Sequence, residues 1–295
     1  MNLIKPEKLN IGDTISIIAP AGAVDKIKIE HAVKYFETKG YKVKLGSNIY
    51  KNVRYMAGSE EERLSDIYEA FSDKEVKAII CARGGFGCIR LINQINFDII
   101  KNNPKIFCGY SDITTLSLVF LKNAGLITFS GSMAQSDFAD NIDAYSEQNF
   151  WNTLTNNYIE IESKNIKIYK EGDTEGILFG GNLATIASMC GIDFIPNEKF
   201  IFFAEDLNEP VYKLDRYLTQ LLNIEEFRNN LAGIVFGEFI NTDNESMLDN
   251  LFQELAEKTD IPIYSGYPIS HGKTKTTVPI GAQSVLEKGI IKISY

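Results

Sequence analysis

Apolar, strand-like runs alternate with amphipathic helical stretches along the first half of the chain, and this alternation constrains the fold more than any other feature. Thr14–Ala19 and Val76–Ala82 are continuous apolar runs of the kind found in strands covered on both faces. Ile106–Gly109 is a third such run, and a stretch with helical apolar spacing follows it. Regular alternation of strand and helix is typical of α/β proteins with a mostly parallel sheet. We therefore predict an N-terminal α/β domain whose sheet is flanked by helices.

The pattern weakens between Ser136 and Thr174 and then begins again. We expect an N-terminal domain over residues 1–155, a linker over 156–174 and a smaller C-terminal α/β domain over 175–295. In the second half, Phe200–Ala204 and Leu231–Phe236 are strand-like runs that end in acidic or glycine residues. Because ligands bind outside the carboxyl ends of parallel strands, the residues that follow each run are the first candidates for a site.

Composition excludes several classes of function. The chain of 295 residues carries a formal net charge of −9 and has no block of basic residues, which argues against a nucleic-acid partner. No apolar run approaches the length of a membrane span, and the N-terminus lacks the apolar stretch of a secretory signal. None of the four cysteines forms a CxxC pair, so we expect buried free thiols, no metal site and no cofactor. These features predict a cytoplasmic protein.

The segment Phe107–Leu116 turns from an apolar run into a helical pattern at Gly109. Ser111 therefore lies where a strand becomes a helix, and Gly125 ends that helix. Hydrolases use this turn to present a serine nucleophile beside backbone N–H groups that bind an oxyanion. The alternative is that Ser111 is a helix N-cap, followed by Asp112 as an acid favoured by the helix dipole.

A glycine-rich segment, Arg83–Gly87, follows the strand-like run Val76–Ala82. Glycines at the start of a helix let backbone N–H groups approach a ligand closely. The spacing matches neither the Walker pattern nor GxGxxG, so a tight turn without a ligand is an equal alternative. Because this segment and Ser111 both follow strands of one parallel sheet, we expect them to be neighbours.

Only two histidines are available as a base. His31 lies off the apolar stripe of its helix, on the solvated face, and we assign it no role. His271 lies in a loop flanked by Gly266 and Gly272, and a loop histidine of this kind can also be a bystander. Glu205 follows the strand-like run ending at Ala204; the alternative is an acid at a solvated helix start. The chain therefore carries a serine, a carboxylate and a histidine in this order: Ser111, Glu205 and His271. They fit the roles of nucleophile, orienting acid and base, respectively.

Several of these segments, in this order, resemble the LD-carboxypeptidase family of serine peptidases. The family includes muramoyl-tetrapeptide carboxypeptidases and the enzymes that inactivate microcin C. The resemblance runs from about Ile15 to Gln283, and its motifs are Ile18–Pro20, Arg83–Gly87, Gly109–Asp112, Gly180–Leu183, Glu205–Arg216, His271-Gly272 and Pro279–Ala282.

The resemblance implies a two-domain α/β protein, often a homodimer, with the active site between the domains. Ser111 matches the nucleophile of the N-terminal domain, and Glu205 and His271 match the acid and base of the C-terminal one. The oxyanion donors correspond to the backbone N–H groups of Gly85, or its neighbour, and of Asp112.

A carboxypeptidase also needs a cation for the terminal carboxylate of its substrate. Arg83 and Arg216 are the candidates, and the alternative for Arg216 is a structural ion pair with Glu209 or Asp215. The chain departs from the family after the strand that follows the nucleophile helix. Where the family commonly has His-Gly-Pro, this chain has Ser130-Gly131-Ser132, which puts substrate preference in doubt.

The resemblance implies a cytoplasmic carboxypeptidase of peptidoglycan recycling, which cleaves the L,D-amide bond to a C-terminal D-amino acid. One alternative is the same triad acting on an aminoacyl-nucleotide antibiotic of the microcin C type. A second alternative, from a different class, is a non-catalytic α/β module that binds a sugar or nucleotide through Arg83–Gly85.

Overall fold

The computed structural model describes residues 2–295, and within them the strands form two sheets. The six-stranded sheet has the order β12-β5-β4-β3-β1-β2. Its strands are β1 (Thr14–Ile18), β2 (Lys42–Leu45), β3 (Val76–Cys81), β4 (Ile106–Cys108), β5 (Thr128–Ser130) and β12 (Val278–Ile280). All neighbours in this sheet pair in parallel except β12, which pairs antiparallel with β5. The predicted mostly parallel N-terminal sheet is therefore confirmed.

Alternate residues of the central strands face two separate cores, which explains their continuous apolar sequence. On one face, Ile17 and Ile80 pack with α1 (Lys26–Thr38) and α5 (Ala144–Thr155). On the other, Ile18 and Ile79 pack with α2 (Glu60–Ser72), α3 (Phe97–Asn102) and α4 (Thr114–Ala124). A strand with helices on both faces has no solvated side, so its pattern does not alternate.

Local signals set the ends of these helices. Ser59 and Glu62 form a capping box at the start of α2, in which each side chain accepts from the other residue's N–H. Gly125 ends α4 in the left-handed conformation, with φ of 71°. After the glycine-rich segment, where the pattern predicts a helix, the chain instead makes two short 3₁₀ turns, Cys88–Arg90 and Ile92–Gln94.

The eight-stranded sheet has the order β6-β14-β13-β8-β9-β10-β11-β7 within the described residues. The four consecutive strands from β8 to β11 run parallel, and antiparallel strands lie on both sides of them. The strands are β6 (Tyr158–Ile161), β7 (Lys167–Lys170), β8 (Thr174–Asn182), β9 (Phe200–Leu207), β10 (Leu231–Ile240), β11 (Ile263–Ser265), β13 (Gln283–Glu287) and β14 (Ile290–Ser294). The helices of this half are α6 (Leu183–Ser188), α7 (Val211–Leu222), α8 (Glu225–Asn230) and α9 (Glu245–Lys258).

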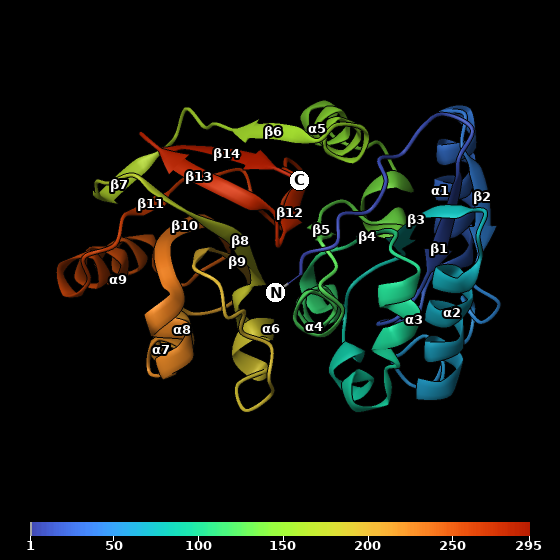
Figure 1. The fold of residues 1–295 in the computed structure, drawn as a ribbon, viewed down its shortest axis with the longest axis horizontal. Coiled ribbons are helices and arrows are strands. Elements are labelled where there is room, and N and C mark those ends of the chain that lie inside the picture. The colour runs from blue at the N-terminus through green and yellow to red at the C-terminus, as the bar shows by residue number, and fades with distance from the viewer. Residues whose placement is uncertain (1) are drawn as a thin grey trace.

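The two sheets lie side by side, and α4 contacts both α6 and β8 where the halves meet (Figure 1). The chain crosses between the halves more than once. Strands β6 and β7, which fall in the expected linker over 156–174, belong to the eight-stranded sheet, and β12 returns to the six-stranded one. The two-domain α/β class is confirmed, while the domain limits at 155 and 175 stay predictions. No helix among residues 2–295 is both long and apolar enough to cross a membrane.

Candidate active site

Ser111 lies on a strained turn between β4 and α4. Its backbone has a φ of 65°, in the left-handed region that residues other than glycine rarely occupy. The residue that precedes the 3₁₀ turn Ser111–Ile113 is Tyr110, and Ile113 precedes α4. The N-cap alternative for Ser111 is therefore wrong. Strain of this kind persists only where surrounding structure enforces it, and a strained strand-to-helix turn is the geometry that exposes a nucleophilic serine.

Gly84 packs directly against this turn, as the sequence predicts for the two strand ends. A Cβ added at Gly84 would lie 2.7 Å from Ser111 Cβ, 2.9 Å from Ser111 Oγ and 3.6 Å from Asp112 N. No side chain fits in that space. Gly85 follows with a φ of 122°, so the glycine-rich backbone bends around the serine at the place where the oxyanion donors are expected.

Two buried charged groups hold the glycine-rich segment in this position. The Asp112 carboxylate accepts from the N–H of Cys88 at 2.9 Å. Arg63 is 1% exposed, and its Nη1 donates to the carbonyls of Pro20 at 2.7 Å and Gly87 at 2.9 Å. Burial raises the pKa of the Asp112 carboxyl, while the bonds from Cys88 and the Arg63 charge oppose that rise. The sequence does not reveal Arg63 as part of this support, because it lies in α2, distant from every motif.

We predict that Gly84→Ala lowers kcat by about 10- to 100-fold, because its methyl group must displace Ser111 and a shift of about 1 Å at a reacting group costs that much. Steady-state hydrolysis of the substrate measures the loss. Gly191→Ala is the matched control. Its Cβ meets no atom within 4 Å, but its φ of 100° strains any side chain. It should lower the melting temperature and keep the wild-type kcat; equal kcat values for both variants would contradict the steric argument.

His271 and Glu205 form a buried pair. Nδ1 of His271 lies 2.5 Å from Glu205 Oε2, and their side chains are 11% and 4% exposed. Because a carboxylate only accepts hydrogen bonds, Nδ1 is the nitrogen that donates here, and in a neutral imidazole Nε2 then keeps its lone pair. Glu205 lies inside β9, not beyond the end of a strand as predicted, so its position is set by the sheet. This is the arrangement in which a carboxylate fixes the tautomer of a histidine base.

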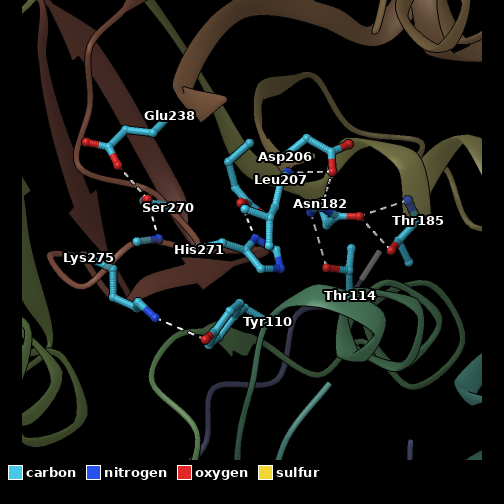
Figure 2. A network of polar contacts seen from close by, with 12 residues as sticks. Tyr110, Thr114, Asn182, Thr185, Asp206, Leu207, Glu238, Ser270, His271 and Lys275 are labelled. Carbon is cyan, nitrogen blue, oxygen red and sulfur yellow. Dashed lines mark hydrogen bonds and ion pairs between the residues drawn. The ribbon is translucent and has the colours of Figure 1, made fainter. Parts of the chain in front are cut away.

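Tyr110 connects this pair to Ser111. Its ring packs edge-on against the His271 ring, with centroids 4.9 Å apart and planes at 83° (Figure 2). His271 therefore contacts the residue directly before the serine. Among residues 2–295, no hydrogen bond joins Ser111 to His271. Hydrogen bonds between catalytic groups are often long in an empty site and shorten when substrate binds.

Asp206 lies beside Glu205 and holds the start of α6. Its carboxylate accepts from Asn182 Nδ2 and Leu207 N, each at 2.8 Å (Figure 2). It also accepts from Ala184 N at 2.8 Å. The N–H of Asn182 donates to Thr114 Oγ1 on α4 at 3.3 Å, so this network also joins the two halves. Burial raises the pKa of Asp206 to about 6, and the charge of Glu205 adds to the rise. Asn182 received no role from the sequence, although an asparagine between a strand and a helix is a recognisable cap.

The raised pKa of Asp206 predicts a pH dependence of stability. Between the ordinary pKa of 3.8 and the folded value of about 6, the folded chain keeps a proton that the unfolded chain has lost. The contribution of Asp206 to the free energy of unfolding therefore falls as pH rises from 4 to 6, by up to about 3 kcal/mol. Asp206→Asn removes this titration, so its unfolding free energy relative to the wild type should increase across that window in urea titrations. Parallel pH profiles for the two proteins would contradict it.

The two arginines that are candidates for binding a substrate carboxylate lie in different surroundings. Arg83 is half-buried beside the serine turn, and its Nη1 donates to the carbonyl of Ala23 at 3.3 Å. Arg216 is exposed on α7, with its guanidinium 5.5 Å from the centre of the Tyr212 ring. Glu209 pairs with Lys213, and no ion pair of Arg216 occurs in the described part of the chain. The structural ion pair of Arg216 is therefore wrong, and of the two arginines only Arg83 belongs to the glycine-rich segment that packs on Ser111.

The segment that departs from the family pattern is buried. Ser132 is 0% exposed, and a Cβ added at Gly131 would lie 2.6 Å from the side chain of Thr277. The segment leads into the helical turn Ala134–Phe138, which carries Asp137.

Three of the four cysteines, Cys81, Cys88 and Cys108, are buried free thiols as predicted, and Cys190 is partly exposed. In the part of the chain that the structure describes, no three His, Cys, Asp or Glu side chains are grouped so that they could hold a metal ion.

Comparison with known proteins identifies the family of this chain. Residues 15–131 match the family described as LD-carboxypeptidase N-terminal domain, and residues 175–286 match LD-carboxypeptidase C-terminal domain. A probable murein peptide carboxypeptidase of Bacillus subtilis (strain 168) is 36% identical over 292 residues, which cover 96% of this chain and 91% of the relative.

The murein tetrapeptide carboxypeptidase of Pseudomonas aeruginosa is 30% identical over 291 residues, which cover 94% of each chain. Among solved structures, the crystal structure of an MccF-like protein from Bacillus anthracis is similar, with a TM-score of 0.92 at 28% identity. The match covers 99% of this chain and 100% of that chain.

Proposed function

The chain belongs to the LD-carboxypeptidase family of serine peptidases, and on this premise we propose that it removes a C-terminal D-amino acid from peptidoglycan tetrapeptides. The scissile bond is the amide between an L-configured centre and the D-residue. The observation that carries the proposal is the buried pair of His271 Nδ1 and Glu205 Oε2 at 2.5 Å, whose imidazole touches the residue that precedes the strained Ser111. The relatives named as murein carboxypeptidases support the substrate class.

In the proposed reaction, Ser111 Oγ attacks the carbonyl carbon while its proton passes to Nε2 of His271. Glu205 holds the other ring nitrogen and stabilises the imidazolium that forms. The backbone N–H groups of Gly85, or its neighbour, and Asp112 bind the oxyanion; loss of one such donor raises the barrier by about 2.7–4 kcal/mol in a comparable hydrolase. The proton on Nε2 passes to the leaving nitrogen as the carbon–nitrogen bond breaks, and the D-amino acid departs.

Water completes the cycle. It attacks the acyl-enzyme carbonyl, gives its proton to Nε2 of His271, and that proton returns to Ser111 Oγ as the ester bond breaks. We assign Arg83 to the substrate's terminal carboxylate, since a guanidinium suits bidentate binding of a carboxylate and Arg83 lies beside the serine turn.

A second candidate substrate is an aminoacyl-nucleotide antibiotic of the microcin C type. The likeness to the MccF-like structure over the whole chain favours it. The same triad would cleave the amide, so the two candidates differ in what the cleft accepts on either side of that bond. The cytoplasmic location, the homodimer and the role in peptidoglycan recycling stay predictions.

A panel of substrates tests the proposal. The purified protein is incubated with a free tetrapeptide, a disaccharide tetrapeptide and an aminoacyl-sulfamoyl nucleotide, and products are identified by mass spectrometry. We expect loss of one D-alanine from the tetrapeptides. Hydrolysis of the nucleotide alone would move the assignment to the second candidate. Binding of muropeptides without any cleavage would favour the non-catalytic module.

A further inference from the structure

Lys275 places a buried positive charge next to the proposed base. The residue is 3% exposed, and its Nζ lies 2.6 Å from Asp137 Oδ1. It also lies 3.0 Å from Tyr110 OH and 4.2 Å from the centre of the Tyr110 ring (Figure 2). The ammonium therefore binds the hydroxyl and contacts the ring of one tyrosine, and that same ring packs on His271.

A gain in the stability of the fold does not explain why the chain buries the ion pair of Lys275 and Asp137. The side chains of Lys275 and Asp137 are 4% and 10% exposed, whereas those of the surface pair Lys44 and Asp73 are 44% and 32% exposed. Removing two charges from water costs several kcal/mol, and an apolar pair of the same volume is often as stable. The contact between Lys275 and Tyr110 instead indicates that this ion pair positions the tyrosine.

Tyr110 is held at its hydroxyl by Lys275 and at its ring by His271. Asp137, which binds Lys275, is itself held in place because its other carboxylate oxygen accepts from Met133 N at 2.8 Å. Burial, with the charges of Asp137 and Glu205, raises the pKa of Tyr110, so the phenol stays neutral and its oxygen can accept from Lys275. These contacts hold the ring against the imidazole of His271, and the Tyr110 backbone leads directly into Ser111.

The segment that carries both His271 and Lys275 is anchored to the opposite half of the molecule. Lys275 N donates to Ser146 Oγ at 2.8 Å, and that hydroxyl donates to Lys273 O at 2.9 Å. Thr277 N donates to Asn149 Oδ1 at 2.8 Å. Ser146 and Asn149 both belong to α5, so the base is attached to the half that carries the serine.

We propose that Lys275 is a positioning residue: held by Asp137, its ammonium fixes the Tyr110 ring against His271 and so sets the approach of the base to Ser111. The proposal rests on the proposed function. It adds a residue that does not touch the reacting atoms but determines how they meet.

The test compares Lys275→Met with Lys105→Met. Lys105 is 8% exposed, and its Nζ donates to the carbonyls of Asp73 and Val76 at the opposite end of β4 from Ser111. Both variants lose a buried ammonium, but only the ammonium of Lys275 contacts Tyr110 in the candidate site. At a temperature where both are folded, Lys275→Met should lower kcat by about 10- to 100-fold, with KM within about twofold of the wild type, because a misplaced base affects the chemical step. Lys105→Met should keep the wild-type kcat. Equal kcat values for the two variants would overturn the proposal.

Tyr110→Leu is the second variant, and it keeps the proposal testable if Lys275→Met does not fold. Leucine retains apolar volume but removes the ring that joins the ammonium to the imidazole. We expect a fall in kcat of the same size, about 10- to 100-fold, again with little change in KM. A wild-type kcat in Tyr110→Leu would overturn the proposal.

A readout independent of turnover separates this inference from the proposed function. The chain has two histidines, so imidazole ¹⁵N spectra contain two sets of signals, with His31 as an internal reference. Lys275→Met should shift the His271 signals and leave those of His31 in place. If the wild type cleaves nothing in the panel, the proposed function fails while this measurement still decides the role of Lys275. Unchanged His271 signals would overturn it.

Discussion

Replacement of Ser111 by alanine is expected to reduce kcat by about 10⁴- to 10⁶-fold, because no other group supplies the oxygen that forms the acyl-enzyme. The remaining rate would come from substrate binding and the oxyanion donors. Release of D-alanine from the tetrapeptide, followed by mass spectrometry, measures the loss. Substrate binding should persist, since the hydroxyl contributes little surface. Activity within 10-fold of the wild type would remove Ser111 from the mechanism.

Ser111→Gly is the matched control for the backbone at this position. Alanine keeps the strain of a φ of 65°, while glycine adopts that angle without a Cβ clash. We expect both variants to be inactive, and the glycine variant to be more stable than the alanine variant by about 1 kcal/mol. Chemical denaturation measures the difference. This result would show that the turn keeps a strained residue for its hydroxyl and not for stability.

Glu205→Gln should reduce kcat by about 10⁴-fold with the fold intact, as an amide in this place permits the wrong histidine tautomer. A glutamine can direct its NH₂ group at Nδ1 of His271, and the ring proton then moves to Nε2, where it blocks proton transfer from Ser111. The same substitution leaves the imidazolium without its carboxylate. Steady-state kinetics and imidazole ¹⁵N spectra together measure both effects.

Glu238→Gln is the control for a carboxylate of the same neighbourhood. Glu238 is exposed, and its Oε2 accepts from Ser270 Oγ at 2.5 Å, one residue before His271. We expect its kcat to stay within about threefold of the wild type, as for most exposed substitutions. If Glu205→Gln and Glu238→Gln lowered kcat equally, the pairing of Glu205 with His271 would not be the cause.

The order of strands and helices could be predicted from the sequence wherever the cause is local. The apolar run of β3, the capping box of Ser59 and Glu62 and the stop at Gly125 each depend on residues within a few positions of one another. Predictions failed where packing with distant residues decided the outcome. Glu205 lies inside β9 because its neighbours β8 and β10 extend the pairing past the apolar run.

The types of residue in the candidate site could be predicted from the sequence, but the residues that hold them in place could not. A serine at a strand-to-helix turn, a carboxylate and a loop histidine are each visible in the sequence. The lysine that fixes Tyr110 is not, because Lys275 lies in a polar stretch with no periodic pattern. Its partner Asp137 is 138 positions away in sequence, in a segment where the pattern of strands and helices weakens.

The amino-acid sequence is enough to predict local conformations and the chemical groups available: which runs become strands, where helices begin and end, and which side chains could serve as nucleophile, acid and base. Which of these side chains meet depends on the arrangement of the strands in the folded chain. His271 lies in the loop between β11 and β12. It reaches Glu205, 66 positions away, because β9 and β11 belong to one sheet, and it reaches Tyr110 because β12 returns to the other sheet. The physical reason is that hydrophobic periodicity and capping act between near neighbours, whereas contacts across the halves depend on strand order and on the closure of long loops.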